Sequence, residues 1–198
     1  MTDAADIDPR QQIIAARARA LAGCPTARKA IELLADSESF TEYGLLAGRT
    51  TSVDDDDPSD GLVGGVCDIG GQPAVVAAHD RSVEDGTHSD RNMRKLAKLI
   101  TIAVANRWPL LLFIEGDGSR PSDPRPAPPI VNYTRARWDV LEGLTEMSGW
   151  APTVALVVGS ARDSHSALAF LCDLVIATNH SDFGSLIEPQ VKLSPAMA

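Results

Sequence analysis

The segment from Ala74 to Arg120 constrains the fold most. It reads AVVAAHDRSVEDGTHSDRNMRKLAKLITIAVANRWPLLLFIEGDGSR: an apolar strand pattern, a glycine turn, an amphipathic helix, a second apolar strand and a second glycine-rich turn. Apolar residues recur at helical spacing from Ser89 to Asn106, whereas the run at 109–115 is short and continuously apolar. This order predicts a βαβ unit with a central, parallel strand at 109–115. Both turns should lie at the edge of the sheet where α/β proteins place their ligands.

Further strand and helix patterns alternate around this unit, which predicts an α/β fold with right-handed crossovers. A Gly70–Gly71 turn indicates a hairpin within 62–80. Gly23 and Pro25 indicate a break between two N-terminal helices. We expect a helical segment over residues 1–26 and one domain over 27–198. The other expected elements are helices at 10–22, 26–36, 133–148 and 164–171 and strands at 152–159 and 173–178, with a Pro-rich loop before the third helix.

Composition narrows the possible partners. The 198 residues are 44% hydrophobic, enough for one substantial core. A formal net charge of −9 argues against nucleic acid and anionic membrane as partners, although a local basic patch can still hold an anionic coenzyme A (CoA) ester. No apolar run approaches the roughly 20 residues that span a bilayer, and the N-terminus is acidic, so we expect a cytoplasmic protein.

Cysteine, histidine and aspartate spacing gives no metal motif. The cysteines are odd in number and far apart, which favours buried, inert thiols. The histidines have no two-ligand spacing on one helix, and each is interpreted as structural. Four consecutive aspartates lack the spaced ligands and glycine of a calcium loop. The cysteines are Cys24, Cys67 and Cys172, the histidines are His79, His88, His165 and His180, and the aspartates are Asp54–Asp57.

Two loops that directly follow buried strands are candidates for chemistry. In the first, Gly116 and Gly118 allow a sharp turn whose N–H groups can hold an oxyanion. In the second, we expect a turn at Gly159 and Ser160 and a helix that begins near Ser164 with unpaired N–H groups. The simpler alternatives are glycines needed only for geometry, and Asp163 or Ser164 as an ordinary N-cap. The sequence has no GxSxG, Walker A or complete GxGxxG motif, which argues against a serine hydrolase, nucleoside triphosphatase or dinucleotide enzyme.

In combination these segments resemble the N-terminal half of the carboxyltransferase subunits of biotin-dependent acyl-CoA carboxylases, in the crotonase-like superfamily. The similarity runs from about Ala27 to Glu188, and several weak motifs in the right order are more specific than any one of them. The similar segments are ARKAIELLADSESFTEYG, DGLVGGVCDIGGQPAVVAAHD, DGTHSDRNMRKLAKLITIAVANRWPLLLFIEGDGSR and VVGSARDSHSALAFLCDLVIAT.

The resemblance implies a crotonase-like spiral of ββα units that binds an acyl-CoA. In this family the N-terminal half supplies CoA contacts and a backbone oxyanion hole for biotin, and a second half supplies the hole for the thioester enolate. The implied cofactors are carboxybiotin on a partner carrier and a CoA ester as substrate. The implied partners are a biotin carrier protein or biotin carboxylase subunit and the second carboxyltransferase half, in a homo- or hetero-oligomer. The implied catalytic residues are Gly116, Gly118, Ser119, Asp163, Ser164 and His165, and the implied substrate-binding residues are Gly86, Thr87 and Arg120.

One departure from the family pattern bears on activity. Asp163 and Ser164, followed by His165, stand where the family has paired glycines. A carboxylate beside a developing anion is unfavourable unless it points away. The family also continues into a second domain, so the resemblance implies activity only with a partner. Two alternatives therefore stay open: a non-catalytic scaffold or regulatory subunit of a carboxylase, and a crotonase-type acyl-CoA decarboxylase.

Overall fold

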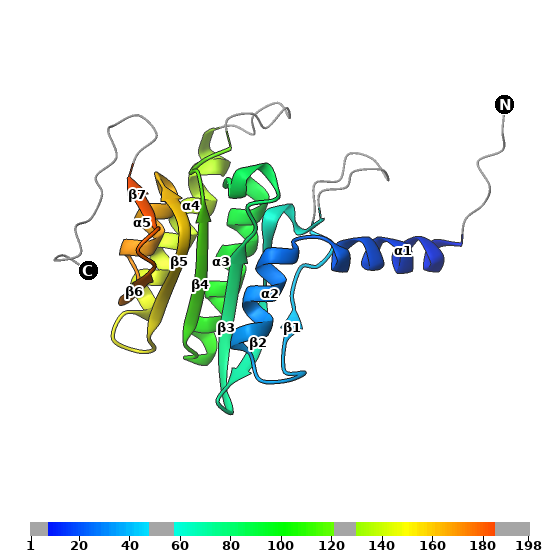
Figure 1. Cartoon of the computed structure of the whole chain (residues 1–198), viewed down its shortest axis with the longest axis horizontal. Helices are drawn as coiled ribbons and strands as arrows, with labels where there is room; N and C mark the ends of the chain where they lie inside the picture. Colours follow the sequence, from blue (N-terminus) through cyan, green and yellow to red (C-terminus); the bar gives the residue numbers. More distant parts are fainter. Residues whose placement is uncertain (1–7, 48–57, 121–129, 185–198) are drawn as a thin grey trace.

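The computed structural model describes residues 8–47, 58–120 and 130–184, and shows one sheet flanked by helices (Figure 1). The Pro-rich loop and the four aspartates lie outside the described residues. Labels follow Figure 1. The elements are α1 Pro9–Ala22, α2 Pro25–Leu34, β1 Thr41–Glu42, a 3-10 helix at Pro58–Gly61, β2 Leu62–Ile69, β3 Gln72–His79, a 3-10 turn at Glu84–Gly86, α3 Asp90–Asn106, β4 Leu110–Gly116, α4 Ile130–Met147, β5 Thr153–Arg162, α5 Ser164–Phe170, β6 Leu174–Ala177 and β7 Asp182–Gly184.

The sheet follows the order β1-β2-β3-β4-β5-β6, with β7 paired to the far end of β5. The β1–β2–β3 part is antiparallel, and β3 to β6 are parallel. Gly70 and Gly71 make the β2–β3 turn at positive φ, and the Asp36 carboxylate accepts hydrogen bonds from both of their amides. The predicted hairpin and the predicted central, parallel strand are both confirmed.

Helix α3 begins at a capping box, in which the Ser89 hydroxyl accepts from the Asn92 amide while the Asn92 side chain accepts from the Ser89 amide. Its apolar stripe packs with α4 against one face of the sheet. The main core lies between these layers and includes Leu96, Ile100, Leu112 and Ala155, all at most 1% exposed. The periodicity in 89–106 thus predicted the buried side of this helix.

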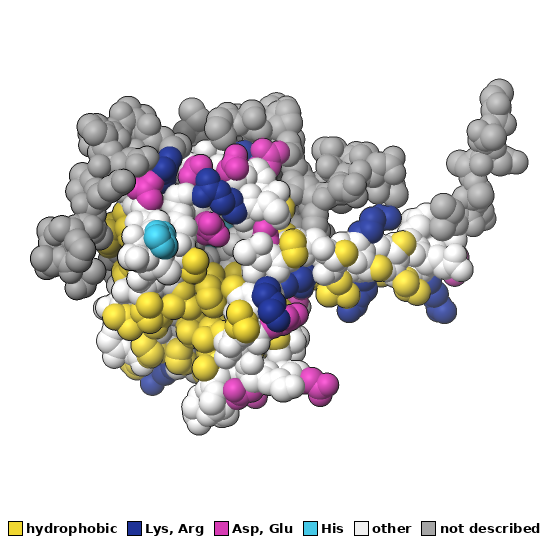
Figure 2. Space-filling view, in the orientation of Figure 1, with side chains coloured by type: hydrophobic (Ala, Val, Ile, Leu, Met, Phe, Trp, Pro, Cys, Tyr) yellow, Lys and Arg dark blue, Asp and Glu magenta, His cyan; other side chains and the backbone are white. Residues whose placement is uncertain are grey.

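The opposite face of the sheet is only partly covered. Helix α2 packs on β2 and β3 through Ala27 and Ile31, but no described helix covers the outer part of β5 and β6. Three aliphatic side chains on that part, Val158, Leu174 and Ile176, are 61%, 52% and 52% exposed. Figure 2 shows the apolar patch on this face, with charged side chains gathered above it.

Strand β5 is longer than predicted. The sequence suggested a turn at Gly159 and Ser160, but both residues continue the strand, and the chain turns only at Asp163. The reason is an added pairing at the end of β5, where residues 160–162 pair with β7. The expectation of a turn at Gly159 was therefore wrong. The Glu115 carboxylate lies over Gly159, with Oε1 2.3 Å from the place where a Cβ would be.

The three cysteines form no disulfide with one another: Cys24 and Cys67 are buried, as predicted, and Cys172 is half-buried. Burial, with nearby aspartates, raises the pKa of Cys67 and of Cys172 to about 11, so both are protonated at neutral pH. None of the helices within the described ranges is both long and apolar enough to cross a membrane.

Candidate functional site

The two predicted loops do converge at the carboxyl ends of β4 and β5. A Cβ added to Gly118 would lie 2.9 Å from the Asp163 Cβ, and one added to Gly116 would lie 2.8 Å from the His165 ring. Gly86 joins them, because its carbonyl oxygen would be 2.5 Å from that same Gly116 Cβ. Parallel strands end at one edge of the sheet, so residues about 47 positions apart in sequence meet here.

The amides at this edge are not available in the way the sequence suggested. The Gly118 N–H donates to Nδ1 of His165 at 3.1 Å, and the Asp163 N–H donates to the Gly184 carbonyl at 2.7 Å. An Asp163 carboxylate oxygen would be 3.0 Å from a Cβ on Gly118, so the acid lies against the loop. The amides of Gly118 and Asp163 therefore have partners within the chain, and the oxyanion role of the two loops stays a prediction. Asp163 does occupy the N-cap position of α5, but its side chain makes no capping hydrogen bond.

Arg120 is a structural residue. Its Nη1 lies 2.6 Å from Asp60 Oδ1, and the two side chains are 3% and 1% exposed. Its remaining donors reach Oγ1 and the carbonyl oxygen of Thr87, at 3.2 and 3.3 Å. With its guanidinium enclosed, Arg120 fastens the chain after β4 to the segment before α3, and its role in substrate binding stays a prediction.

The other predicted residues hold the loops in place. Gly86 adopts φ +71°, and a Cβ there would lie 2.4 Å from the Glu115 carbonyl oxygen, so only glycine fits this close approach. The Thr87 hydroxyl donates to the Glu84 carbonyl at 2.6 Å. The Ser119 hydroxyl accepts from the Arg137 guanidinium. The catalytic or binding roles of Gly86, Thr87 and Ser119 stay predictions.

Three histidines that the sequence gave no reason to group lie together beneath these loops. His79 ends β3, His88 precedes α3 and His165 belongs to α5, and the three are 4%, 1% and 0% exposed. The His88 and His165 rings stack with centroids 3.7 Å apart, whereas His79 meets His165 edge-on at 4.8 Å. The available signal was that His79 lies at the end of a strand and His165 lies shortly after one. His180 is exposed and lies apart from the three.

All three imidazoles are neutral at pH 7. Burial lowers the pKa of His79 from 6.5 to about 4. Burial also lowers the pKa of His88 and of His165 well below 6.5, and the neighbouring histidines and Arg137 add to this effect. A buried imidazolium would be costly here, because each ring borders another ring that would compete for the positive charge.

The cluster can be tested as a metal centre, since one nitrogen from each ring lies within 4.8 Å of the others. An imidazole binds a metal ion in the plane of its ring. His88 and His165 are stacked at an interplanar angle of 24°, so their in-plane lone pairs do not meet at a common point. Nδ1 of His165 already accepts from Gly118, which leaves the hydrogen of the neutral ring on Nε2. This arrangement does not fit a three-histidine metal site.

A basic pocket of about 470 Å³ lies on the exposed side of α3, toward the loop after β1. Lys95 lies in its floor: its Nζ donates to the Leu62 carbonyl at 2.6 Å and is 3.9 Å from Glu42. Burial lowers the pKa of Lys95 to about 8. Its lining combines four cations with aromatic and aliphatic side chains, namely Tyr43, Gly44, Leu46, Ala47, Arg91, Arg94, Lys95, Lys98 and Leu99.

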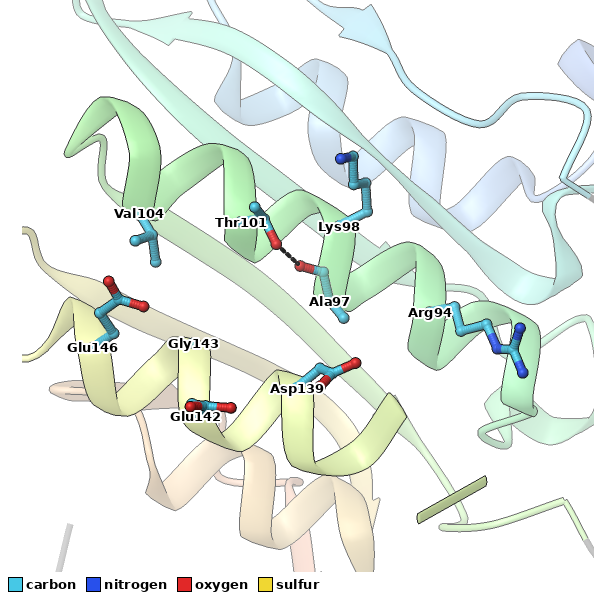
Figure 3. Close-up of a pocket in the computed structure, with 9 residues that line it drawn as sticks. All are labelled: Arg94, Ala97, Lys98, Thr101, Val104, Asp139, Glu142, Gly143 and Glu146. Carbon is cyan, nitrogen blue, oxygen red and sulfur yellow. Dashed lines mark hydrogen bonds between the residues drawn. The ribbon is translucent and has the colours of Figure 1, made fainter. Parts of the chain in front are cut away.

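A second pocket, of about 400 Å³, lies between α3 and α4 (Figure 3). Arg94 and Lys98 project from α3 and are shared with the basic pocket. The α4 side carries three carboxylates, Asp139, Glu142 and Glu146. These acids would repel a phosphate, so the basic pocket is the better place for an anionic ligand.

Comparison with known proteins identifies the family. The model of the carboxyl transferase domain matches residues 19–185. The chain belongs to the carboxyl transferase domain family. It is 28% identical over 179 residues to the biotin-dependent long chain acyl-coenzyme A carboxylase beta4 subunit of Mycobacterium tuberculosis, covering 89% of this chain and 33% of that subunit. It is 25% identical over 170 residues to the propionyl-CoA carboxylase beta chain of Cereibacter sphaeroides, covering 84% and 32%.

Solved structures of related proteins share the fold, which is crotonase-like as predicted. A single-chain, multi-domain long-chain acyl-CoA carboxylase superposes with a TM-score of 0.75 at 31% identity, over 99% of this chain and 21% of that one. A Pseudomonas malonate decarboxylase hetero-tetramer, solved with malonate, gives 0.69 at 25% identity, over 80% and 60%. The chain spans about a third of the length of the curated carboxylase relatives named above.

Proposed function

We propose that this chain is the N-terminal-type half of an acyl-CoA carboxyltransferase, which transfers a carboxyl group from carboxybiotin to an acyl-CoA together with a partner chain or domain. The observation that carries the proposal is the carboxyl transferase match over residues 19–185. The names of two relatives, a long chain acyl-CoA carboxylase and a propionyl-CoA carboxylase, support a CoA ester as the substrate class. They do not fix the length of the acyl chain.

The basic pocket supports the CoA part of this proposal. CoA carries phosphates and an adenine ring, and the pocket places Arg94 and Lys98 beside the half-exposed Tyr43 ring. Cations bind phosphate oxygens through charge-assisted hydrogen bonds, and an aromatic face can stack on a base. This local positive charge offsets the net charge of −9 for a ligand of CoA size, because solvent screens the more distant acids.

Biotin does not fit the Gly118 loop as the described residues arrange it. A ureido oxygen gaining negative charge needs free donors, but the amides of Gly118 and Asp163 have partners within the chain. The Asp163 carboxylate beside the loop adds repulsion. The biotin contribution in the proposal therefore depends on the partner carrier and the second half, and no step is assigned to these two amides.

The open sheet face supports the need for a second half. Val158, Leu174 and Ile176 form an exposed aliphatic surface continuous with the sheet, which a monomeric protein would normally cover. One related structure, the Pseudomonas malonate decarboxylase, is a hetero-tetramer. We infer that the second carboxyltransferase half or another subunit of the complex is the partner in this homo- or hetero-oligomer.

Ligand-induced stabilisation tests the CoA step. Acetyl-CoA or propionyl-CoA at 100 times its Kd should add about 2.7 kcal/mol to the stability of the folded chain, visible as a rise in Tm. The Arg94→Glu, Lys98→Glu variant should lose most of that rise, whereas Arg135→Glu, on the exposed face of α4, should keep it. A lack of any shift for wild-type protein at millimolar CoA ester would contradict the proposal.

The occupied amides favour a second candidate, a non-catalytic scaffold or regulatory subunit. Carboxyl transfer from carboxybiotin, assayed with a biotin carrier and the second half present, separates the two. The scaffold proposal expects complex formation without turnover. Release of CO2 from a malonyl thioester without biotin would instead support the decarboxylase alternative.

A further inference from the structure

A continuous chain of hydrogen bonds runs beneath the α5 turn and is separate from the amides discussed above. Ser164 Oγ lies 3.0 Å from Nδ1 of His88, and Nε2 of His88 lies 3.0 Å from Nε2 of His79. Nδ1 of His79 lies 3.1 Å from the carbonyl oxygen of Phe113. Four groups from β3, β4, α5 and the segment before α3 are thereby joined in one line.

The donor and the acceptor of every hydrogen bond in this series can be assigned by starting from the Phe113 carbonyl at one end. The Phe113 carbonyl can only accept, so Nδ1 of His79 carries a hydrogen. A neutral His79 then has a lone pair on Nε2, and Nε2 of His88 must donate to it. A neutral His88 in turn has its lone pair on Nδ1. That lone pair faces Ser164 and accepts the hydroxyl hydrogen.

His79 and His88 are both neutral at pH 7, as this assignment of donors and acceptors requires. Burial holds the pKa of His79 at about 4, and burial together with His165, His79, Arg137 and Arg120 holds the pKa of His88 well below 6.5. At pH 7 the ring next to Ser164 is therefore present as the base. Such a base is also weak, so proton transfer to it is slow compared with transfer to a histidine of ordinary pKa.

We propose that Ser164 is a nucleophile, with His88 as its general base and His79 as the positioning residue that fixes the His88 tautomer, and that its substrates are activated acyl esters or thioesters. This activity is distinct from carboxyl transfer and does not depend on biotin or on the proposed CoA pocket. Nucleophile, base and a third orienting group within hydrogen-bond reach are the arrangement that activates a hydroxyl.

The reaction balances with water as the co-reactant. Ser164 Oγ attacks the acyl carbon as its proton passes to Nδ1 of His88. The bond from carbon to the leaving oxygen or sulfur breaks, and the leaving group takes that proton, which leaves an acyl-serine. Water then attacks the acyl-serine, gives one proton to His88, and releases a carboxylic acid as His88 returns the proton to Ser164. The net change is hydrolysis of the ester or thioester.

Access and rigidity are both suited to this role. Ser164 is half-buried, whereas His79 and His88 are 4% and 1% exposed. The His165 ring stacks on His88 at 3.7 Å and is itself held by the Gly118 amide. The base is thereby kept in one orientation toward the serine.

The test is acylation of the full chain by p-nitrophenyl acetate, with the modified residue located by peptide mass spectrometry. We expect acetyl-Ser164, with labelling reduced at least about tenfold in Ser164→Ala. The matched control is Ser166→Ala, two positions along α5, whose hydroxyl donates to the Ala161 carbonyl rather than to an imidazole. It should label like wild type. Unchanged labelling in Ser164→Ala, or acetylation at other residues only, would overturn the proposal.

Two further measurements address the histidines. His79→Gln retains an acceptor for the His88 N–H and should retain most of the acylation rate, whereas His79→Leu should lose about tenfold, at matched Tm. The rate, corrected for hydroxide, should show no inflection near 6.5, the ordinary histidine pKa. Nitrogen NMR should report the Nδ1–H form of His79 and the Nε2–H form of His88. The opposite tautomers, or zinc bound by these rings, would contradict the proposal, while CoA binding would be unaffected.

Discussion

The amide of Gly118 donates a hydrogen bond to Nδ1 of His165, 47 residues further along the chain, at a distance of 3.1 Å. This bond ties the loop after β4 to helix α5 and uses an N–H group that the sequence offered as an oxyanion donor. The buried His165 ring thereby holds the loop against α5. The contribution of this hydrogen bond to stability can be measured directly.

Replacing His165 with Ala should destabilise the chain by about 2–4 kcal/mol, because a cavity forms and the buried Gly118 amide loses its acceptor. The free energy of unfolding from urea titration measures this change. His180→Ala, at an exposed position, should change it by less than about 0.5 kcal/mol. Equal effects of the two substitutions would show that the Gly118 bond is unimportant for stability.

The Arg120–Asp60 pair gives a second prediction. Arg120→Met should lower the free energy of unfolding by about 3–5 kcal/mol, because Asp60 is left as a buried, uncompensated charge. Arg135→Met, which breaks the exposed pair with Asp139, should cost no more than about 1 kcal/mol. If Arg120→Met weakened CoA-ester binding and left stability intact, the structural role assigned to Arg120 would be wrong.

Two glycines with similar backbone angles allow the energetic cost of a left-handed conformation to be distinguished from that of a steric clash. Gly71 and Gly86 have φ of +74° and +71°, but a Cβ on Gly71 meets nothing within 4 Å, whereas one on Gly86 meets the Glu115 carbonyl. Gly71→Ala should cost about 1–2 kcal/mol from the left-handed conformation alone. Gly86→Ala should cost clearly more in the same unfolding assay. Similar losses of stability in the two variants would mean that the backbone at Glu115 moves away from the added methyl group at little energetic cost.

Lys95 predicts a pH dependence of stability. Its pKa is about 8 in the folded chain against an ordinary 10.5, so the unfolded chain holds more protons between these values. Stability should therefore rise as the pH increases from about 8 to 10.5, by up to about 3 kcal/mol from this group. The difference in unfolding free energy between wild type and Lys95→Met isolates this slope from tyrosine and cysteine titration. A constant difference across the range would contradict the lowered pKa.

Local pattern was enough to predict most elements of the fold. The apolar stripe at 89–106, the Gly70–Gly71 turn and the continuous apolar run at 109–115 each specify one local geometry, so α3, the hairpin and β4 follow from the sequence. The motif order also predicted the family that the comparison over residues 19–185 identified. The end of β5 was missed because it is set by pairing with β7, a contact between distant residues.

The sequence by itself also determined which loops lie at the carboxyl edge, since strand ends follow from the alternation of strands and helices. Only the tertiary structure decided what those loops present. Whether an amide is free depends on which acceptor lies beside it in the folded chain, and here the acceptors are the His165 ring and the Gly184 carbonyl oxygen. The tertiary structure likewise brings His79, His88 and Ser164 together. Their hydrogen bonds depend on packing between β3, α3 and α5, and no periodic pattern in the sequence predicts them.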